Sequence, residues 1–215
     1  PLPLPRAAMA VVAVLVFAVI PFAASDYTLS LFNLMGIACL GAIGLNILVG
    51  YTGQISIGHA AFMSVGAYTA ANLVVRGGLP WWVAMPCAGL MAALVGAFFG
   101  LPSLRIKGLY LAISTLAAQL IIEWALNHIT WISGGMQASI YVRRPTLFGV
   151  EFKSNFAFYY LIYLVLALGI VFALNLFRTH LGRAFVAVRD DDVAAGMMGI
   201  NVVYTKALAF LVGAF

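Results

Sequence analysis

The residues most suited to chemistry gather in one glycine-rich stretch, GLNILVGYTGQISIGHAAFMSVGAY, which spans 44–68. Its strongly polar side chains would be penalised in hydrocarbon, so they should face protein or water. Glycines and small residues let helices pack closely, or let a helix open where its backbone faces a cavity. We therefore expect either the wall of a translocation path or a tight packing seam with an ordinary turn at 50–54, and the residues favour both equally. The candidate pathway residues in this stretch are Asn46, Gln54, Ser56, Gly58 and His59.

His59 is also considered as a metal ligand or proton relay. A metal site needs several nitrogen, sulfur or carboxylate ligands. The other histidines, His128 and His180, belong to opposite ends of other apolar segments. A packed core histidine is therefore the favoured interpretation, and we expect no metal site.

A second polar group has helical spacing. Thr115, Gln119 and Glu123 follow one another at intervals of four residues, which places them on one face of a helix. This face is either a polar stripe along a pathway, with Thr115 and Gln119 in it, or a helix end with Glu123 as an interfacial carboxylate. The interfacial interpretation of Glu123 is slightly favoured.

The third candidate is the loop 178–203, which begins RTHLGRAFVAVRDDDVAAGMMGIN. Periodicity predicts helices over 181–188 and 191–198, with Asp190 to Asp192 at the start of the second, where the helix dipole favours anions. Gly199 resembles a helix stop. A short helix of this kind could dock a soluble partner, or the loop could be a solvated connector, and its predicted order favours docking.

Composition sets the class of protein that must position these residues. The chain has 215 residues, of which 65% are hydrophobic and 8% charged, and a mean hydropathy of +1.09. Soluble domains carry about 25% charged residues, so a soluble enzyme, a nucleic-acid binder and a disordered tail are excluded. The net charge of +5 comes from scattered basic residues that form no stripe for nucleic acid. Cys39 and Cys87 lie in apolar runs and are expected to be small buried residues.

The apolar runs predict an all-α, polytopic transmembrane helix bundle with about seven spans, because a crossing needs about 20 apolar residues. We interpret residues 1–215 as a single transmembrane domain that is truncated at its C-terminus, with the first span retained rather than cleaved. The predicted spans are 7–25, two within 27–75, 77–104, 108–127, 156–177 and a seventh that begins near Tyr204.

Basic residues predict the orientation, since Lys and Arg gather on the cytoplasmic side of membrane proteins. The inner set is Arg6, Arg105, Lys107, Arg178, Arg183, Arg189 and Lys206. The outer set is Arg76, Arg143, Arg144 and Lys153. This asymmetry puts 102–107 and 178–203 in the cytoplasm and 128–155 outside.

Three motifs in order, GLNILVGYTGQISIGHAAFMSVGAYTAA, RIKGLYLAISTLA and GRAFVAVRDDDVAAGMMGIN, resemble the permease subunits of branched-chain amino-acid ABC importers. The likeness runs from about residue 30 to the end and is closer to the LivM type than to the LivH type. Importers of urea, short amides and aromatic acids share this scaffold, so the substrate stays open. The outer loop departs from the pattern, with Gly134-Gly135-Met136-Gln137-Ala138 where relatives tend to show Gly-Gly-Ser-x-Gly.

The resemblance implies a bacterial inner-membrane subunit that pairs with a second permease, docks two cytoplasmic ATP-binding subunits and receives substrate from a periplasmic binding protein. It assigns ATPase coupling to the inner loop. Ala194, Ala195 and Gly199 match the Ala-Ala-x3-Gly core of the coupling helix, and Asp192 stands where relatives often carry Glu. The coupling residues are Arg189, Asp192, Ala194, Ala195 and Gly199.

The sequence contains no G-x-x-x-x-G-K-[ST] phosphate loop, so we expect no cofactor in this chain and ATP bound by the partner subunits. An ion-coupled secondary transporter is the alternative, although the repeated intramembrane carboxylates of such proteins are missing. An intramembrane enzyme would need His59 and Glu123 as a catalytic pair, yet they are predicted on opposite sides of the bilayer. We therefore expect a transport subunit and not an enzyme, with membrane lipid around it.

Overall fold

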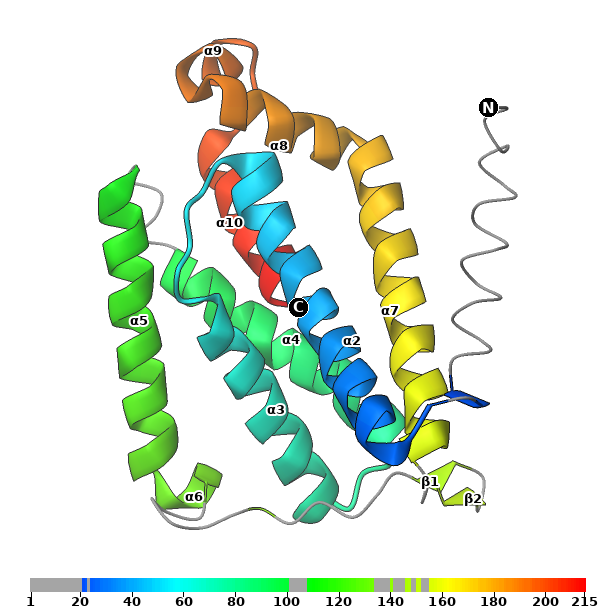
Figure 1. Ribbon diagram of the computed structural model, residues 1–215. Coiled ribbons are helices and arrows are strands. Elements are labelled where there is room, and N and C mark those ends of the chain that lie inside the picture. Colours follow the sequence, from blue (N-terminus) through cyan, green and yellow to red (C-terminus); the bar gives the residue numbers. More distant parts are fainter. Residues whose placement is uncertain are drawn as a thin grey trace, which may run out of the picture.

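Long apolar runs form the helices that dominate the computed structural model (Figure 1). The structure describes residues 21–22, 24–100, 108–133, 140, 146–147, 150–151 and 155–215. The long helices are α2 (Asp26–Asn46), α3 (His59–Val75), α4 (Trp81–Gly100), α5 (Leu109–His128) and α7 (Asn155–Arg178). The shorter ones are α6 (Thr130–Ser133), α8 (His180–Asp190), α9 (Asp192–Met197) and α10 (Val202–Ala214). The strands β1 (Thr146–Leu147) and β2 (Val150–Glu151) pair antiparallel, Thr146 with Glu151 and Leu147 with Val150.

The predicted spans agree with these helices. Within the described part of the chain, four helical stretches are long and apolar enough to cross a membrane: Asp26–Tyr51, α4, α5 and α7. The helix α3, with 17 residues, and α10, with 13, are shorter. The chain is thus an all-α, multi-pass membrane helix bundle, as predicted. Of the first predicted span, 7–25, nearly all lies outside the described residues, as do Arg105 and Lys107.

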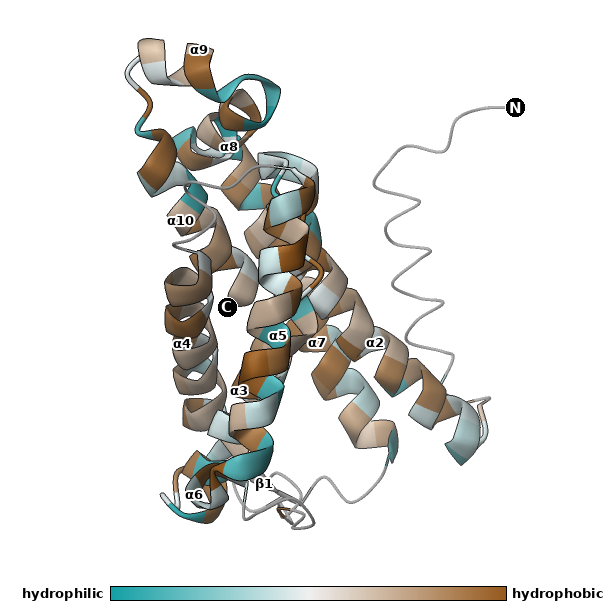
Figure 2. Ribbon diagram, turned by 90° about the vertical axis from the view of Figure 1, so that its left-hand side faces the viewer, coloured by the Kyte–Doolittle hydropathy of each residue, from teal (hydrophilic) through white to brown (hydrophobic). Residues whose placement is uncertain are grey.

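The helices form two groups that meet at one end of the molecule. Helices α2 and α7 run side by side, and α3, α4 and α5 form the other group; the two groups diverge away from α8 (Figures 1 and 2). We call the end where they meet the α8–α9 end. The start of α5 lies at this end, whereas α6, β1 and β2 lie at the opposite end. The predicted inner loop 102–107 lies outside the described residues; the start of α5, which follows it in the sequence, lies at the same end as α8 and α9.

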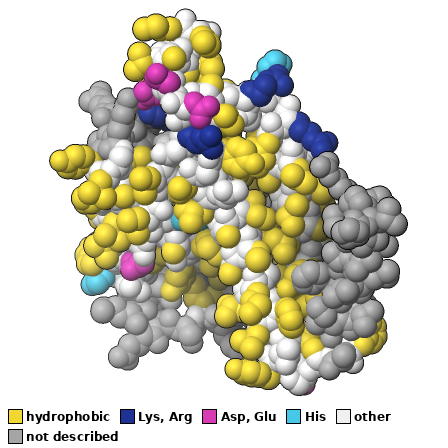
Figure 3. Space-filling view, turned by 45° about the horizontal axis from the view of Figure 1, so that its top comes forward, with side chains coloured by type: hydrophobic (Ala, Val, Ile, Leu, Met, Phe, Trp, Pro, Cys, Tyr) yellow, Lys and Arg dark blue, Asp and Glu magenta, His cyan; other side chains and the backbone are white. Residues whose placement is uncertain are grey.

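The outer surface is largely apolar along the helices, while charged side chains gather at the α8–α9 end (Figure 3). Cys39 and Cys87 are both exposed on this surface, so the prediction that they are buried is wrong. The reason is physical: lipid solvates apolar side chains, so apolar neighbours in a membrane protein do not predict burial.

Glycines allow α10 to pack between α2 and α4. A Cβ atom on Gly213 would lie 3.0 Å from the carbonyl oxygen of Gly44, so the backbones of α2 and α10 touch where they cross. On α4, a Cβ at Gly100 would lie 2.7 Å from Cγ of Phe210, a fully buried ring. In lipid, the hydrophobic effect does not hold helices together, because the lipid tails are as apolar as the side chains. Small residues let the helix backbones approach closely, and van der Waals contacts then stabilise the crossing.

Candidate functional site

The connection between α2 and α3 is longer and less regular than the predicted turn at 50–54. Helix α2 continues into a π-helical turn, η1 (Ile47–Tyr51), and regular helix resumes only at His59. We call residues 53–58 the unwound segment. Its end, Gly58, abuts the backbone of Thr115, roughly 9 Å along α5 from its first residue. Figure 1 shows the cyan trace descending to the start of α3 part of the way down the bundle.

Side chains of the unwound segment alternate between inside and outside. Gln54, Ser56 and Gly58 are buried, whereas Ile55 and Ile57 are 43% and 55% exposed. Extended backbone points successive side chains to opposite faces, so the polar residues face the protein and the isoleucines face away from it. Non-helical backbone at membrane depth is tolerated only where protein buries it or where it borders a water-filled cavity.

Hydrogen bonds attach the unwound segment to neighbouring helices. The backbone N–H of Ile57 donates to Oγ1 of Thr115 on α5 at 3.1 Å. The side-chain amide of Gln54 donates to Oγ1 of Thr52 at 3.1 Å and to the backbone carbonyl of Lys206 on α10 at 3.5 Å. The segment therefore joins η1, α5 and α10 through polar contacts.

Two buried polar atoms near this segment have no hydrogen-bond partner among the described residues: Oγ of Ser56 and Nδ1 of His59. His59 opens α3 and lies against α2, because a Cβ on Gly44 would be 3.0 Å from its Nε2. Its ring meets Phe62 edge-on, with centroids 6.0 Å apart. The site thus combines a tight helix seam, at Gly44, with an opened backbone that carries unsatisfied polar groups.

The predicted polar face of α5 is present, but its members differ in surroundings. Thr115 is buried, and a Cβ on Gly58 would lie 3.4 Å from Cβ of Gln119, so both residues adjoin the unwound segment. Gln119 donates to Glu123 at 2.8 Å. Glu123 is exposed, in the part of α5 that leads to α6.

The structure brings together most of the predicted pathway residues but not all of them. One residue stands apart: Asn46 is exposed on α2, and its side chain lies against Gly50. The residues that gather around the unwound segment are Gln54, Ser56, Gly58, His59, Thr115 and Gln119.

The predicted inner-loop helices are confirmed as α8 and α9. The carboxylate of Asp191 caps α9, accepting from the backbone N–H groups of Val193 at 2.9 Å and Ala194 at 3.2 Å. Gly199 has φ +87°, the left-handed conformation typical of a helix stop. Beyond it, Asn201 caps α10 by accepting from the N–H of Tyr204.

The exposed surface of α9 does not include Ala195, one of the coupling residues that the resemblance implies. Ala195 is only 2% exposed and faces the protein interior. The outward residues are Val193, Met197 and Met198, and the two methionines are 84% and 82% exposed. We call these three the α9 apolar edge. A partner that contacts α9 meets this edge, and Ala195 allows α9 to pack closely on its own bundle.

A cavity of about 310 Å³ lies between the inner loop and the unwound segment, and residues of both line it. At this cavity Nζ of Lys206 lies 3.2 Å from Oδ2 of Asp192, and Lys206 is buried. Arg189 donates from Nη1 to the carbonyl of Gly50 at 3.0 Å. The cavity is lined by Thr52, Gly53, Gln54, Gly108, Leu111, Val188, Arg189, Asp190, Asp191, Asp192 and Lys206.

Sequence reasoning used Lys206 only as a marker of orientation and so missed this contact. A usable signal was available, because Lys206 stands alone within an apolar run and a charge in such a run requires a partner. The partner, fourteen residues earlier, could not be chosen among three consecutive aspartates without the structure.

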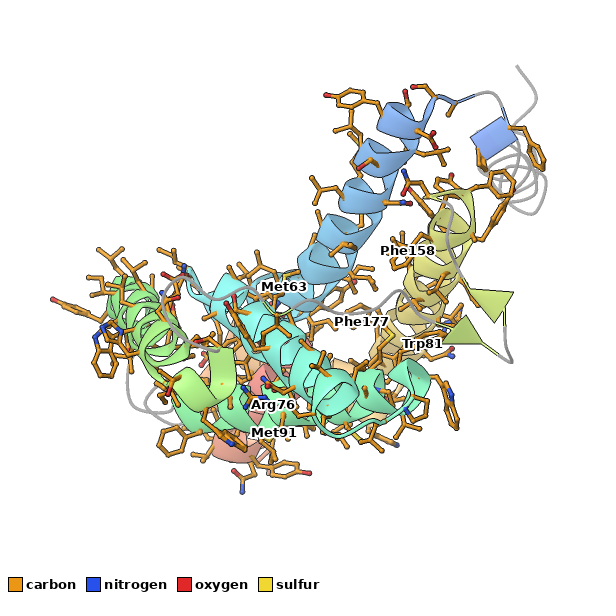
Figure 4. The ribbon with its side chains drawn as sticks, turned by 90° about the horizontal axis from the view of Figure 1, so that it is seen from below. Met63, Arg76, Trp81, Met91, Phe158 and Phe177 are labelled. Carbon is orange, nitrogen blue, oxygen red and sulfur yellow. The ribbon has the colours of Figure 1, made fainter. Side chains whose placement is uncertain are left out.

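At the opposite end, α3 is attached to α6. Asn72 donates to the carbonyl of Ile132 at 2.7 Å. Arg76 donates to the carbonyl of Trp131, with its guanidinium 5.8 Å from the centre of that indole (Figure 4). The nearby sequence Gly134 to Ala138, where the outer loop departs from the family pattern, lies outside the described residues, as do Arg143, Arg144 and Lys153.

Comparison with known proteins adds the following. The sequence profile described as "Branched-chain amino acid transport system / permease component" matches residues 27–215. The high-affinity branched-chain amino acid transport system permease protein LivM of Escherichia coli (strain K12) is 38% identical in an alignment of 227 positions that covers 94% of this chain and 53% of that protein. Its namesake from Salmonella typhimurium (strain LT2) is 36% identical in an alignment of 226 positions, with the same coverage. The chain spans about half the length of these curated relatives, and no solved structure matches it.

Proposed function

The chain belongs to the family of branched-chain amino-acid transport permease components, and from this premise we propose that it is a membrane-spanning subunit of an ATP-driven importer. The proposed substrates are branched-chain or related amino acids, because the matched relatives are named for the transport of branched-chain amino acids. The proposed location is the bacterial inner membrane. The proposed partners are a second permease, two cytoplasmic ATP-binding subunits and a periplasmic binding protein.

The observation that carries this proposal is the position of α9. This helix projects at the charged end of the bundle, and its α9 apolar edge is exposed there rather than along the hydrocarbon-facing helices (Figures 1 and 3). Unbranched, polarisable methionines adapt to the shape of a groove on a partner. A short helix with an apolar edge docks in such a groove, and ATP hydrolysis in the partner would move it.

The proposed pathway follows the unwound segment. An amino acid carries an ammonium and a carboxylate, so a path for it must offer hydrogen bonds to both. Ser56, His59 and Gln119 supply donors and acceptors beside non-helical backbone, as broken helices do at the substrate sites of other transporters. Ion-coupled secondary transport by this chain is the competing proposal.

The test is uptake by the assembled system. The chain is reconstituted in liposomes with the proposed second permease, ATPases and binding protein, and uptake of labelled leucine is measured with and without ATP. We expect uptake that requires ATP and every partner, and that excess valine inhibits. A matched complex whose ATPase lacks its phosphate-loop lysine serves as the control. Uptake by this polypeptide alone, driven by an ion gradient, would contradict the proposal in favour of a secondary transporter.

Substrate class is measured in the same vesicles by competition. Urea, a short amide and benzoate are added in excess over leucine. We expect none of them to inhibit. Inhibition by one of these compounds, with no effect of valine, would contradict the proposal that the substrate is a branched-chain amino acid. The proposal that the chain belongs to an ATP-driven importer would still stand.

A further inference from the structure

We propose that Lys206 links the docking helix α9 to the unwound segment, so that movement of α9 changes the conformation of the pathway. This inference rests on the proposed function, because it describes how an ATP-driven permease would transmit motion within one subunit. Lys206 acts as a positioning residue, with its side chain bonded to Asp192 and its backbone bonded to Gln54.

The first contact joins α10 to α9. Lys206 and Asp192 form an ion pair at 3.2 Å, and their side chains are only 10% and 20% exposed. Removing one partner of such a pair leaves an uncompensated charge in a poorly solvated place, which is strongly unfavourable. The first residue of α9 and the second turn of α10 are therefore expected to move together.

The second contact joins α10 to the unwound segment. The carbonyl of Lys206 accepts from Nε2 of Gln54 at 3.5 Å, and Gln54 is itself buried. The same amide nitrogen bonds Thr52, and the backbone N–H of Gln54 donates to the carbonyl of Leu48 at 3.1 Å. A shift of Lys206 therefore acts at the second residue of the unwound segment.

A separate contact reaches the same region from α8. Arg189 donates to the carbonyl of Gly50, and its Cγ would lie 2.9 Å from a Cβ on Gly53, a glycine with φ +66°. The last turn of α8 thus contacts the start of the unwound segment directly, while the first residue of α9 reaches Gln54 through Lys206. The cavity of about 310 Å³ between these contacts is lined by Gly53 and Gln54, so no packed side chain fills the space beside them.

The test measures the unwound segment directly in the assembled, membrane-bound complex. Ile55, which is exposed, is replaced by cysteine in a background with Cys39→Ala and Cys87→Ala. The rate of labelling by a maleimide is measured without nucleotide and with ATP plus vanadate. With the ion pair intact, we expect the two rates to differ about tenfold, which is within the usual range of coupling between sites.

Asp192→Asn and Lys206→Gln are each expected to abolish this ATP-dependent difference. Uptake should fall at least about tenfold, while ATPase activity at the membrane stays within about twofold. The exchange Asp192→Lys with Lys206→Asp restores an ion pair and should recover both labelling and uptake. Arg183→Gln, which removes a cation from the exposed side of α8, is the charge-matched control and should change neither.

The outcomes separate this inference from the proposed function. If the wild-type complex takes up no amino acid, the proposed function fails. If it transports and both single variants keep the ATP-dependent labelling of position 55, the link is overturned. If a single variant fails to insert into the membrane, the double variant with the exchanged charges is used instead. A double variant that inserts and shows ATP-dependent labelling supports the link. A double variant that inserts without ATP-dependent labelling overturns it. Failure of the double variant to insert makes the pair structural, which also overturns the link.

Discussion

The two ends of α10 are held by different kinds of contact. Around Gly213 the helix touches the backbone of α2 directly, with no room for a methyl group. Around Lys206, about 10 Å away along the helix, it is held by an ion pair and an amide hydrogen bond at the edge of a cavity. Steric contact between backbones cannot adjust without separating the helices, whereas polar side chains can re-form bonds after a small shift. α10 therefore has one fixed end and one adjustable end.

The largest effect is expected at the fixed end. Gly213→Leu would force the crossing of α2 and α10 apart, and overpacking of this kind costs roughly 1–3 kcal/mol or more. We expect a large fall in the thermal midpoint of the purified complex, measured by intrinsic fluorescence. Gly196→Ala on α9, where the nearest atom would be 3.9 Å away, is the control. An unchanged midpoint in Gly213→Leu would show that this end is adjustable too.

The next effect is expected where α3 begins. Gly58→Ala places a Cβ against the carbonyl oxygen of Thr115 and should displace α5, with loss of transport and of stability. Gly66→Ala, within α3 and with 3.8 Å of clearance, should be nearly neutral. The measurement is leucine uptake together with the thermal midpoint. Equal behaviour of the two variants would contradict the close approach of α3 and α5.

Leucine at Gly58 or at the fully buried Ala61 should likewise block transport. Because both residues are packed against neighbours, such a block would report helix displacement and not only an obstructed path.

A smaller effect is expected from the hydrogen bond that attaches the unwound segment to α5. Thr115→Val removes the hydroxyl that accepts from Ile57 and leaves a partly buried N–H without this partner, a change worth about 1 kcal/mol, near the lower end of the range for a lost hydrogen bond. Thr115→Ser keeps the hydroxyl and is the matched control. The free energy of unfolding, measured by denaturant titration in detergent, should fall for valine and stay close to wild type for serine.

The smallest effect on stability is expected at the α9 apolar edge, which lies beyond the Lys206 end of α10. Met197→Ser combined with Met198→Ser alters only exposed side chains, so the thermal midpoint should remain unchanged. Binding of the ATPase should weaken, measured as the fraction that sediments with membranes. Leu181→Ser on the exposed part of α8 is the control. Full ATPase recruitment by the methionine variant would contradict the role of the α9 apolar edge.

Much of this fold could be predicted from the sequence because lipid demands long apolar helices. The lengths of charge-free runs located α2, α3, α4, α5, α7 and the start of α10, and periodicity located α8 and α9, with the aspartates and Gly199 marking the ends of α9. The four-residue helix α6 was not predicted, because it lies within a segment read as a loop. The buried state of Ala195 could not be predicted, because a six-residue helix offers too few turns to show which side faces the bundle.

The unwound segment was predicted only in part. The glycines around residue 50 indicated a break, but its extension to Gly58 was missed because Ser56, Ile57 and Gly58 resemble the start of a tightly packed helix. A period-two pattern was nevertheless present, with Gln54, Ser56 and Gly58 alternating with isoleucines. The contacts of Lys206 connect distant residues, and no local pattern encodes them.

The extended backbone of residues 53–58 gives the subunit a hinge that can bend without breaking helical hydrogen bonds. Each residue removed from an α-helix loses a backbone hydrogen bond of the i to i−4 ladder. The unwound segment has no such ladder, and its backbone N–H groups at Gln54 and Ile57 bond to residues outside it. It can therefore lengthen or bend without melting any helix, so each gating movement would require rotation about single bonds rather than local unfolding.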